Sequence, residues 1–324
     1  MGLDDKLVRK KLEVLLKDDI LVERYLRTYG PRLDMAHIVK LKQGAVDAAG
    51  SGGGGAIDDP TYQIKVKCPI CNQVDIICYE LKAKSLTTTP DRFLIPRYFG
   101  VKGFKTLNFS LISVTVCPIC LFASPDKRDF TTFSVQARSE NKTQIGPFVL
   151  DELRKKVEER KTFIGGVTDF AAYFKYPRQA EAAKTSYRLA IHRALVEASL
   201  ESPLAWYKAG MYSLKMAMLA RDTGGDDEAV LQEAVGFLAK SFRNSEVKTP
   251  DLEYQLIYTI SALYLRLGDE TQCQAFMGVL DKRRTELDKQ SKEDPSVTTI
   301  AIEKWIDKIK DMWTDRKDPD LWKH

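Results

Sequence analysis

The tetrapeptide Cys-Pro-Ile-Cys occurs twice in this chain, once from Cys68 to Cys71 and once from Cys117 to Cys120. A Cys-x-x-Cys turn lets two thiolates converge on one metal ion, and two such turns supply the four sulfur ligands that a closed structural zinc site prefers. The repeated tetrapeptide therefore predicts one zinc ion per chain, bound by these four cysteines. No other feature of the sequence constrains the fold as strongly.

The segment between the two turns, residues 72–116, is 45 residues long, whereas the gap in such sites is usually roughly 15 to 20 residues. The added length is tolerable because each doubling of a loop costs only about 0.6 kcal/mol. A structural zinc ion, by comparison, contributes about 10 to 16 kcal/mol to the folded state. We therefore expect residues 72–116 to be an insertion with its own structure.

A pair of redox dithiols or disulfides is the alternative, because Cys-x-x-Cys also occurs in thiol redox proteins. Both turns, however, follow β-branched residues: Ile64 and Val66 before the first, and Val114, Thr115 and Val116 before the second. This flanking predicts two strands that lead into two metal-binding turns. Asn72 after the first turn tolerates a left-handed backbone, whereas Leu121 after the second does not, so we expect the second turn to be less regular.

Composition places the chain among globular proteins. With 324 residues, 44% of them hydrophobic, it is large enough to bury the cores of two or three structural units. It has no apolar run of about 18 residues, and its charged start lacks the apolar core of a signal peptide. We therefore expect no membrane insertion and a cytoplasmic location, where thiols stay reduced and free to bind metal.

The formal net charge of +5 is unevenly distributed. Residues 61–140 carry 11 Lys and Arg against 6 Asp and Glu, whereas residues 141–324 carry 29 of each kind. A basic surplus of this size is compatible with binding to nucleic acid or to another acidic partner. An ordinary solvated face is the favoured interpretation of this surplus.

Two segments precede the cysteines. Leucines at helical spacing predict helices over residues 1–49. The run Gly-Ser-Gly-Gly-Gly-Gly at residues 50–55 formally matches the dinucleotide-binding fingerprint, but that fingerprint requires a strand before it and a helix after it. We therefore interpret residues 50–60 as a flexible linker.

Residues 61–140, here called the cysteine module, alternate β-branched, aromatic and polar residues, as strands do. Two runs show the alternation: Ile76, Cys78 and Glu80, and Leu107, Phe109, Leu111 and Ser113. Cys78 is predicted to be a small buried residue rather than a ligand. For residues 91–98, a compact polar and aromatic group, we favour a packing role over anion binding.

Residues 141–324 are here called the helical part. A helix is predicted to begin at Pro147, and breaks between later helices are predicted near residues 202–203, 223–225, 249–250, 267–268 and 294–295. This pattern predicts stacked helical hairpins. Five residues fit a tetratricopeptide pattern: Tyr264, Gly268, Cys273, Met277 and Leu280. Aromatic residues of the helical part could line a peptide-binding groove, although helices at this spacing bury most of one stripe. His192 is expected to be exposed or half-buried.

These features together resemble a bacterial family classed as a domain of unknown function. The resemblance rests on the two Cys-Pro-Ile-Cys turns, on Pro96-Arg97-Tyr98, Phe122-Ala123-Ser124 and Asp129-Phe130, and on the helical tail. It covers about residues 61–285 and implies a zinc-ribbon-like head, a tetratricopeptide-like tail and bound zinc, but no reaction. The expected fold class is α+β and multidomain: a helical N-terminal segment, a small β zinc-ribbon-like module and an all-α tetratricopeptide-like array.

Three functions fit the sequence. The chain lacks a phosphate-binding loop, a His-Glu-x-x-His motif and a Gly-x-Ser-x-Gly motif, which favours a noncatalytic scaffold or adaptor that binds a partner protein through its helical part. Alternatively, the cysteine module binds nucleic acid, with Phe93, Tyr98, Phe99, Phe104 and Phe109 as stacking surfaces beside Arg97 and Lys102. The third possibility is a thiol redox or zinc enzyme, although four cysteines would close the position that a catalytic zinc keeps open. The oligomeric state stays open.

Overall fold

The computed structural model describes residues 57–134, 139–294, 298–318 and 321–322. The helices predicted over residues 1–49 and the glycine-rich run at residues 50–55 lie outside these ranges. The chain divides into two compact units, Met1–Asp58 and Asp59–His324. All elements described below belong to the second unit.

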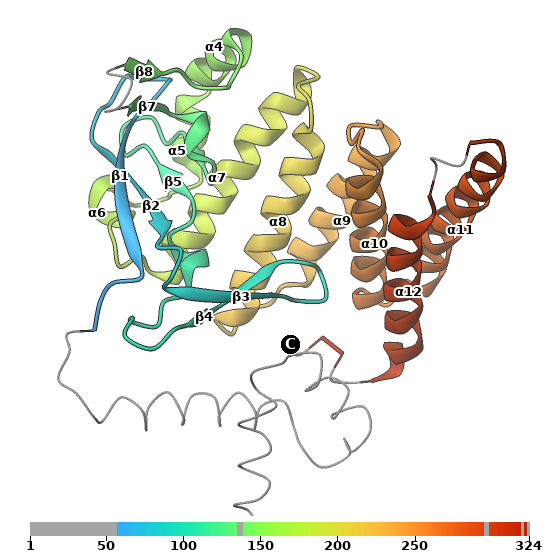
Figure 1. Cartoon of the computed structure of the whole chain (residues 1–324). Helices are drawn as coiled ribbons and strands as arrows, with labels where there is room; N and C mark the ends of the chain where they lie inside the picture. Colours follow the sequence, from blue (N-terminus) through green and yellow to red (C-terminus); the bar gives the residue numbers. More distant parts are fainter. Residues whose placement is uncertain (1–56, 135–138, 295–297, 319–320, 323–324) are drawn as a thin grey trace, which may run out of the picture. The chain divides into compact units, whose positions relative to one another are not determined.

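Short antiparallel strands build the cysteine module (Figure 1). A four-stranded sheet has the order β2-β1-β7-β8, formed by Ile76–Leu81, Thr61–Lys67, Thr131–Ser134 and Ser139–Asn141. Strand β3 (Leu86–Pro90) pairs with β4 (Pro96–Gly100), and β5 (Thr115–Val116) pairs with β6 (Ala123–Ser124). Strand β1 ends directly before Cys68 and β5 directly before Cys117, so both strands predicted to lead into the metal-binding turns are present.

One predicted strand is wrong. The alternating run from Leu107 to Ser113 forms the short 3-10 helix η1 (Phe109–Leu111) instead. The side chain of Asn108 accepts a hydrogen bond from the backbone N–H of Ser110 at 3.0 Å, and such a cap favours a helical turn over an extended strand. A second 3-10 helix, η2 (Lys127–Asp129), begins after Asp126, whose side chain accepts from the backbone N–H of Arg128.

Helices follow from residue 147 onward, as predicted. They are α4 (Pro147–Lys155), α5 (Val157–Thr162), α6 (Phe170–Tyr173), α7 (Ala180–Ser199), α8 (Ala205–Asp222), α9 (Glu228–Arg243), α10 (Pro250–Arg266), α11 (Glu270–Glu293) and α12 (Ile300–Thr314), before the 3-10 helix η3 (Asp315–Lys317). Pro147 and Pro250 each stand at the start of a helix, where a missing N–H costs nothing. The model is therefore mixed α and β, with its strands before its helices.

Neighbouring helices of the series α7 to α12 pack against one another (Figure 1). Helices α8 and α9 approach closely at Gly210, where an added Cβ would lie 2.5 Å from Cγ of Leu238. Helices α10 and α11 form a hairpin around Gly268, whose φ is +79°, and Cys273 is fully buried beside it. The tetratricopeptide likeness predicted from the sequence stays a prediction.

The cysteine module and the helical part share apolar cores. Phe93 and Ile95, at the tip of the β3–β4 hairpin, pack in the same cluster as residues of α8 to α12. Residues Val114, Val116 and Leu121 pack in the same cluster as residues of α7 and α8. The domain boundary that the sequence predicts between residues 140 and 141 stays a prediction, because the two regions share these cores.

Residues 91–98 have the packing role that the sequence favours. The carboxylate of Asp91 accepts backbone hydrogen bonds from Phe93 and Ile95, each at 2.9 Å, and this closes the hairpin turn. The ring of Phe93 stacks on Trp322 with 5.3 Å between centroids. Arg97 lies 3.8 Å from Asp222 of α8, so an ion pair also ties β4 to the helices.

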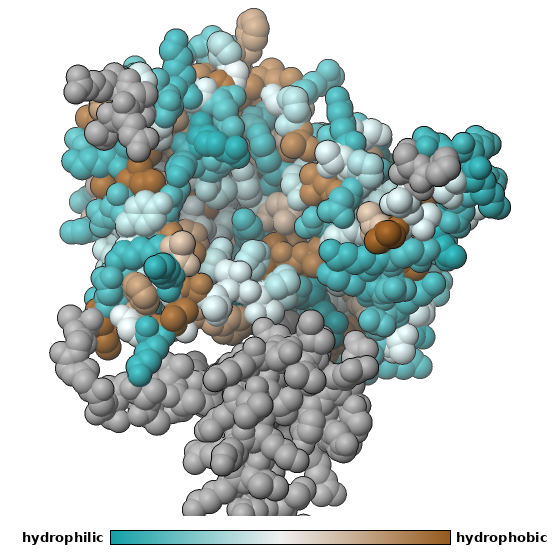
Figure 2. Space-filling model, in the orientation of Figure 1, coloured by the Kyte–Doolittle hydropathy of each residue, from teal (hydrophilic) through white to brown (hydrophobic). Residues whose placement is uncertain are grey.

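The surface gives two further facts. Within the described ranges, none of the helices combines the length and the apolar character that a membrane span requires. On the face that Figure 2 shows, hydrophilic residues dominate the surface around α11 and α12.

Candidate metal centre

The two Cys-Pro-Ile-Cys turns have the same backbone geometry. In the first, the N–H of Cys68 donates to the carbonyl of Gln73 at 2.8 Å, and the N–H of Asn72 donates to Cys68 at 3.1 Å. In the second, the N–H of Cys117 donates to Phe122 at 2.8 Å, and that of Leu121 donates to Cys117 at 2.9 Å. The repeated tetrapeptide thus folds into a repeated turn.

Leu121 corrects the expectation that the second turn is less regular. Its φ of 58° matches the 61° of Asn72, so a leucine occupies the left-handed region that its side chain disfavours. Leu121 is fully buried and packs among residues of α7 and α8. Burial of its apolar side chain, which contributes about 1.5 to 3 kcal/mol, offsets the backbone strain of roughly 1 to 3 kcal/mol.

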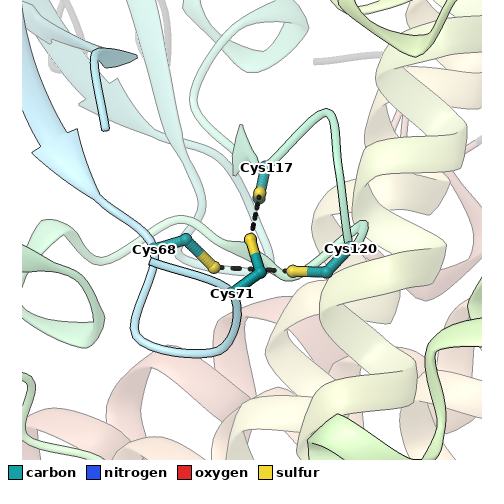
Figure 3. A group of neighbouring side chains, drawn as sticks. All are labelled: Cys68, Cys71, Cys117 and Cys120. Carbon is teal, nitrogen blue, oxygen red and sulfur yellow. Dashed lines mark hydrogen bonds between the residues drawn. The ribbon is translucent and has the colours of Figure 1, made fainter. Parts of the chain in front are cut away.

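The four sulfur atoms lie together, and the side chains point toward a common centre (Figure 3). All four Sγ atoms are within 4.8 Å of one another, and the Cys68–Cys120 and Cys71–Cys117 pairs are each 3.5 Å apart. A tetrahedral ion with sulfur ligands at about 2.3 Å needs sulfurs about 3.8 Å from one another. The four cysteines therefore fit the ligand set of one metal ion.

The other two cysteines stay apart from this group. Cys78 is buried on β2 and Cys273 is buried on α11, as expected for small core residues. Among the described residues, the one group of His, Cys, Asp and Glu side chains close enough to hold a metal ion consists of the four turn cysteines.

Residues 61–311 match the model of a family described as an uncharacterised protein conserved in bacteria, DUF2225. The chain belongs to this family. The match begins with the strand before the first metal-binding turn and ends within α12. No curated protein and no solved structure matches the chain.

The electrostatics of the DUF2225 centre favour a cation. Hydrogen bonds to Cys117 and Cys120, followed by burial, raise the pKa of Cys68. Four thiols packed together do not ionise together without a positive charge, because each thiolate would repel the next. A bound metal ion reverses this balance, since it deprotonates its sulfur ligands outright.

Two arginines that the sequence analysis missed support the two turns from α4 and α5. Arg160 is almost fully buried, and its Nε donates to the carbonyl of Cys120 at 2.8 Å while Nη1 donates to Leu153 at 2.8 Å. Arg154 donates from Nε to the carbonyl of Ile70 at 3.3 Å. Each metal-binding turn of this DUF2225 chain thus receives one guanidinium group.

The surroundings of Arg160 also shift its pKa. Burial is the main reason why the pKa of Arg160 lies below its ordinary value, although the nearby Cys120 opposes that shift. A dication with four thiolates carries two negative charges in excess, so the metal-bound centre would supply the compensating charge that this guanidinium needs. No sequence motif marks Arg160, so its support of the second turn can be recognised only in the folded structure.

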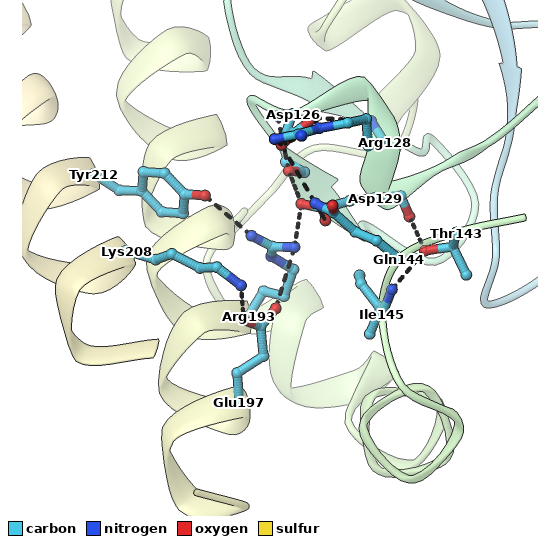
Figure 4. Close-up of polar contacts among 11 residues, drawn as sticks. Asp126, Arg128, Asp129, Thr143, Gln144, Ile145, Arg193, Glu197, Lys208 and Tyr212 are labelled. Carbon is cyan, nitrogen blue, oxygen red and sulfur yellow. Dashed lines mark hydrogen bonds and ion pairs between the residues drawn. The ribbon is translucent and has the colours of Figure 1, made fainter. Parts of the chain in front are cut away.

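A second buried polar group joins the DUF2225 cysteine module to the helices (Figure 4). We call it the Arg193 cluster; it comprises Asp129, Arg193, Glu197, Lys208 and Tyr212. Arg193 of α7 bridges the buried carboxylates of Asp129 and Glu197, and its Nη2 donates to the Tyr212 hydroxyl at 3.1 Å. Lys208 of α8 lies 2.7 Å from Glu197.

The environment of the Arg193 cluster favours its charged form. Burial alone would lower the pKa of Arg193, but Tyr212, Asp129 and Glu197 together raise it above its ordinary value. Asp129 also accepts hydrogen bonds from the Ser124 hydroxyl and from Nε2 of Gln144. Asp129 of η2 thus has three side-chain partners, Arg193, Ser124 and Gln144, and the first of them ties it to α7.

Two other sequence expectations change. His192 is 7% exposed rather than exposed or half-buried, because α7 is covered on several faces, and its Nε2 lies 3.0 Å from the Glu159 carboxylate. Of the aromatics expected to stack on nucleic acid, Phe93 is buried in the core and Tyr98 packs edge-on against Phe109. Phe99 is exposed.

Proposed function

We propose that this DUF2225 protein is a noncatalytic scaffold or adaptor. One zinc ion, bound by Cys68, Cys71, Cys117 and Cys120, fixes the cysteine module, and the helical part binds a partner protein. The observation that supports this most directly is the four-sulfur set, since four cysteines whose Sγ atoms lie within 4.8 Å of one another fill every position of a tetrahedral ion. A catalytic zinc keeps one position open.

The positions of the two turns support a structural role. The first turn follows β1 of the four-stranded sheet, whereas the second connects β5 to β6, which form a separate pair. Strand β6 packs against α7. An ion held by both turns would therefore tie the main sheet to a hairpin that is anchored on the helices.

Zinc is the metal that best fits this ligand set. Tetrahedral sites with four sulfurs bind zinc or iron, and the thiols of this centre, three of them buried, need no redox change to act as a clamp. Metal analysis of the purified full chain should find one equivalent of zinc. Less than half an equivalent after gentle purification, with the six thiols free and the module folded, would rule out the zinc clamp.

The helical part offers a contact for a protein partner on α8 and α9. Several aromatics considered for a groove are core residues, including Tyr187, Tyr212, Tyr254 and Tyr258. Trp206 and Phe237 are only partly buried, with ring centroids 5.9 Å apart, and Nζ of Lys240 lies 4.2 Å from the Trp206 ring. Aromatic side chains of this kind are frequent anchors in protein interfaces.

Affinity capture tests this contact. The full chain, a Trp206→Ala variant and a Phe148→Ala control are used as bait in lysate of the native cell. Phe148 is 85% exposed on α4, outside α8 and α9. We expect one protein to be retained by the wild type and the control but lost with Trp206→Ala. Equal capture by all three baits would remove the proposed contact.

The alternatives lead to different results. A nucleic-acid-binding module should be retained on a nucleic-acid column at low salt and released steeply as salt increases. A zinc or thiol redox enzyme should show metal-dependent hydrolysis or disulfide reduction that Cys117→Ser abolishes. Either result would replace the scaffold as the proposed function.

A further inference from the structure

A cavity of about 330 Å³ lies between the cysteine module and the helices. Its walls come from β2, β4, η1, α7 and α8, and none of the four turn cysteines lines it. Ligand pockets in proteins usually measure about 300 to 1,000 Å³, so this one suits a small molecule. It is separate from the metal centre and from the proposed partner contact.

Lys215 is the unusual residue of this cavity. It lies half-buried on α8, on the same helix face as the half-buried Lys208 and Met211. Within the described ranges its ammonium group has neither an ion pair nor a hydrogen bond, and burial lowers the pKa of Lys215. Lysines removed from water are normally paired, because an unpaired buried charge is costly.

The other charges around the cavity are already balanced. Nζ of Lys127 lies 2.6 Å from the Glu80 carboxylate, and the Tyr62 hydroxyl donates to the same carboxylate. Lys215 is therefore the one lining cation of the described cavity without a counter-charge. A ligand that neutralises it needs a single negative charge.

The remaining walls are suited to the rest of such a ligand. The hydroxyls of Tyr187 and Ser113 lie 2.7 Å apart and line the cavity together with Ser110. The rings of Tyr98 and Phe109 meet edge to face, with centroids 5.5 Å apart. The cavity thus combines one cation, several hydroxyls and an aromatic wall, which is the usual mixture of apolar lining and few polar groups in a ligand site.

We propose that this cavity binds a small organic carboxylate. The carboxylate pairs with the ammonium group of Lys215, the hydroxyls of Tyr187 and Ser113 supply hydrogen bonds, and the apolar end of the ligand rests against Tyr98 and Phe109. A phosphate group, with a charge of about −1.5 to −2, would leave part of its charge uncompensated beside a single lysine.

The walls of the cavity come from segments that are distant from one another in the sequence. Tyr98 and Phe109 belong to the insertion between the two metal-binding turns, whereas Tyr187 and Lys215 belong to α7 and α8. A bound carboxylate therefore contacts the insertion and the helices at once. Because the carboxylate binds the folded chain and is released on unfolding, it stabilises the folded state by mass action.

Isothermal titration of the full chain tests the proposal with phenylacetate as the probe, phenylacetamide as its neutral counterpart, and inorganic phosphate. We expect one phenylacetate per chain, and binding at least about tenfold weaker for phenylacetamide, because the amide lacks the charge that pairs with Lys215. Phosphate should bind more weakly than phenylacetate.

Three variants complete the test. Lys215→Met should weaken phenylacetate binding at least about tenfold, while Lys215→Arg, which keeps the charge, should retain most of it. Lys289→Met, an exposed lysine on α11, is the control and should bind as the wild type does. Without ligand, Lys215→Met should melt at a higher temperature than the wild type, because it removes a half-buried cation that has no counter-charge.

Specific outcomes would overturn the proposal. They are no saturable binding of phenylacetate to the wild type, equal binding of acid and amide, tighter binding of phosphate, or unchanged binding by Lys215→Met. The comparison of acid and amide uses the wild-type protein alone, so it decides the matter even if a variant fails to fold.

Discussion

The candidate metal centre and the Arg193 cluster both lie where the cysteine module meets the helices, but they are built in different ways. The metal centre uses two local turns that differ little in backbone geometry. The Arg193 cluster uses one residue from η2 and two each from α7 and α8. The four cysteines can be recognised in the sequence as a repeated motif, whereas the residues of the Arg193 cluster come together only when the chain has folded.

The energetics of the two connections differ as well. A structural zinc ion contributes about 10 to 16 kcal/mol to folding, so its centre would add stability outright. A buried ion pair must first overcome the desolvation of its charges, and its net contribution is often close to zero. The Arg193 cluster therefore specifies how α7 meets the cysteine module more than it adds stability. Four predictions test this contrast.

The largest effect is expected from Cys117→Ser. Loss of one sulfur ligand should reduce bound zinc to less than half an equivalent and expose the backbone amides of residues 61–135 to rapid hydrogen exchange. Because Val116 and Leu121 share a core with α7, amides near Tyr187 should exchange faster too.

Cys273→Ala is the matched control, because this buried cysteine is outside the four-sulfur group. It should keep one equivalent of zinc and the exchange pattern of the wild type in residues 61–135. A full equivalent of zinc in Cys117→Ser would show that the four cysteines do not act as one site.

The next effect is expected from Arg193→Met. Asp129 and Glu197 would then be buried charges without their bridging cation, and breaking a buried pair in this way costs about 3 to 5 kcal/mol. Urea unfolding should show this loss with zinc still bound. Arg188→Met, at an exposed position of the same helix, should change the free energy of unfolding by less than about 0.5 kcal/mol. Equal effects of the two substitutions would argue against a special role for the cluster.

Arg160→Met should have an intermediate effect. It removes the side-chain donor to the carbonyls of Cys120 and Leu153, of which Leu153 keeps the N–H of Lys156, and this costs about 1 to 3 kcal/mol. Zinc affinity, measured by chelator competition, should fall by about 10- to 100-fold, as for other residues that support metal ligands. Arg154→Met should do less, since that side chain is 49% exposed. The reverse order would contradict the assigned support of the second turn.

The smallest effect concerns pH. Burial lowers the pKa of His192, although the Glu159 carboxylate opposes that shift. Below about pH 6.5 the unfolded chain therefore takes up a proton before the folded one does, and the folded state loses at most about 1.4 kcal/mol per pH unit. His192→Gln should reduce the difference in urea midpoint between pH 7.5 and 5.5. An unchanged difference would place the pH dependence elsewhere.

Parts of this fold could be predicted because they depend on neighbouring residues. Strands before the cysteine turns, helix starts at proline and helix ends near glycine all follow from local geometry, and the structure has them at β1, β5, α4 and around Gly268. The run from Leu107 to Ser113 was mispredicted because the cap of Asn108 outweighs its alternation. The left-handed Leu121 was mispredicted because its stabilising contacts come from α7 and α8.

The candidate site shows the same division. Cys68, Cys71, Cys117 and Cys120 could be named from their spacing, because a metal ion demands that residue type in that pattern. Arg160, the Arg193 cluster and the cavity at Lys215 could not, since their members lie on separate elements. Nothing in the local sequence distinguishes these charged residues from solvated ones.

The sequence by itself therefore determined which four cysteines come together, the order of strands and helices, and the α and β character of this DUF2225 chain. Only the tertiary structure decided which charges are buried, what compensates them and where a ligand could enter. The physical reason is that spacing fixes local backbone geometry, whereas the cost of a buried charge depends on every segment that packs around it.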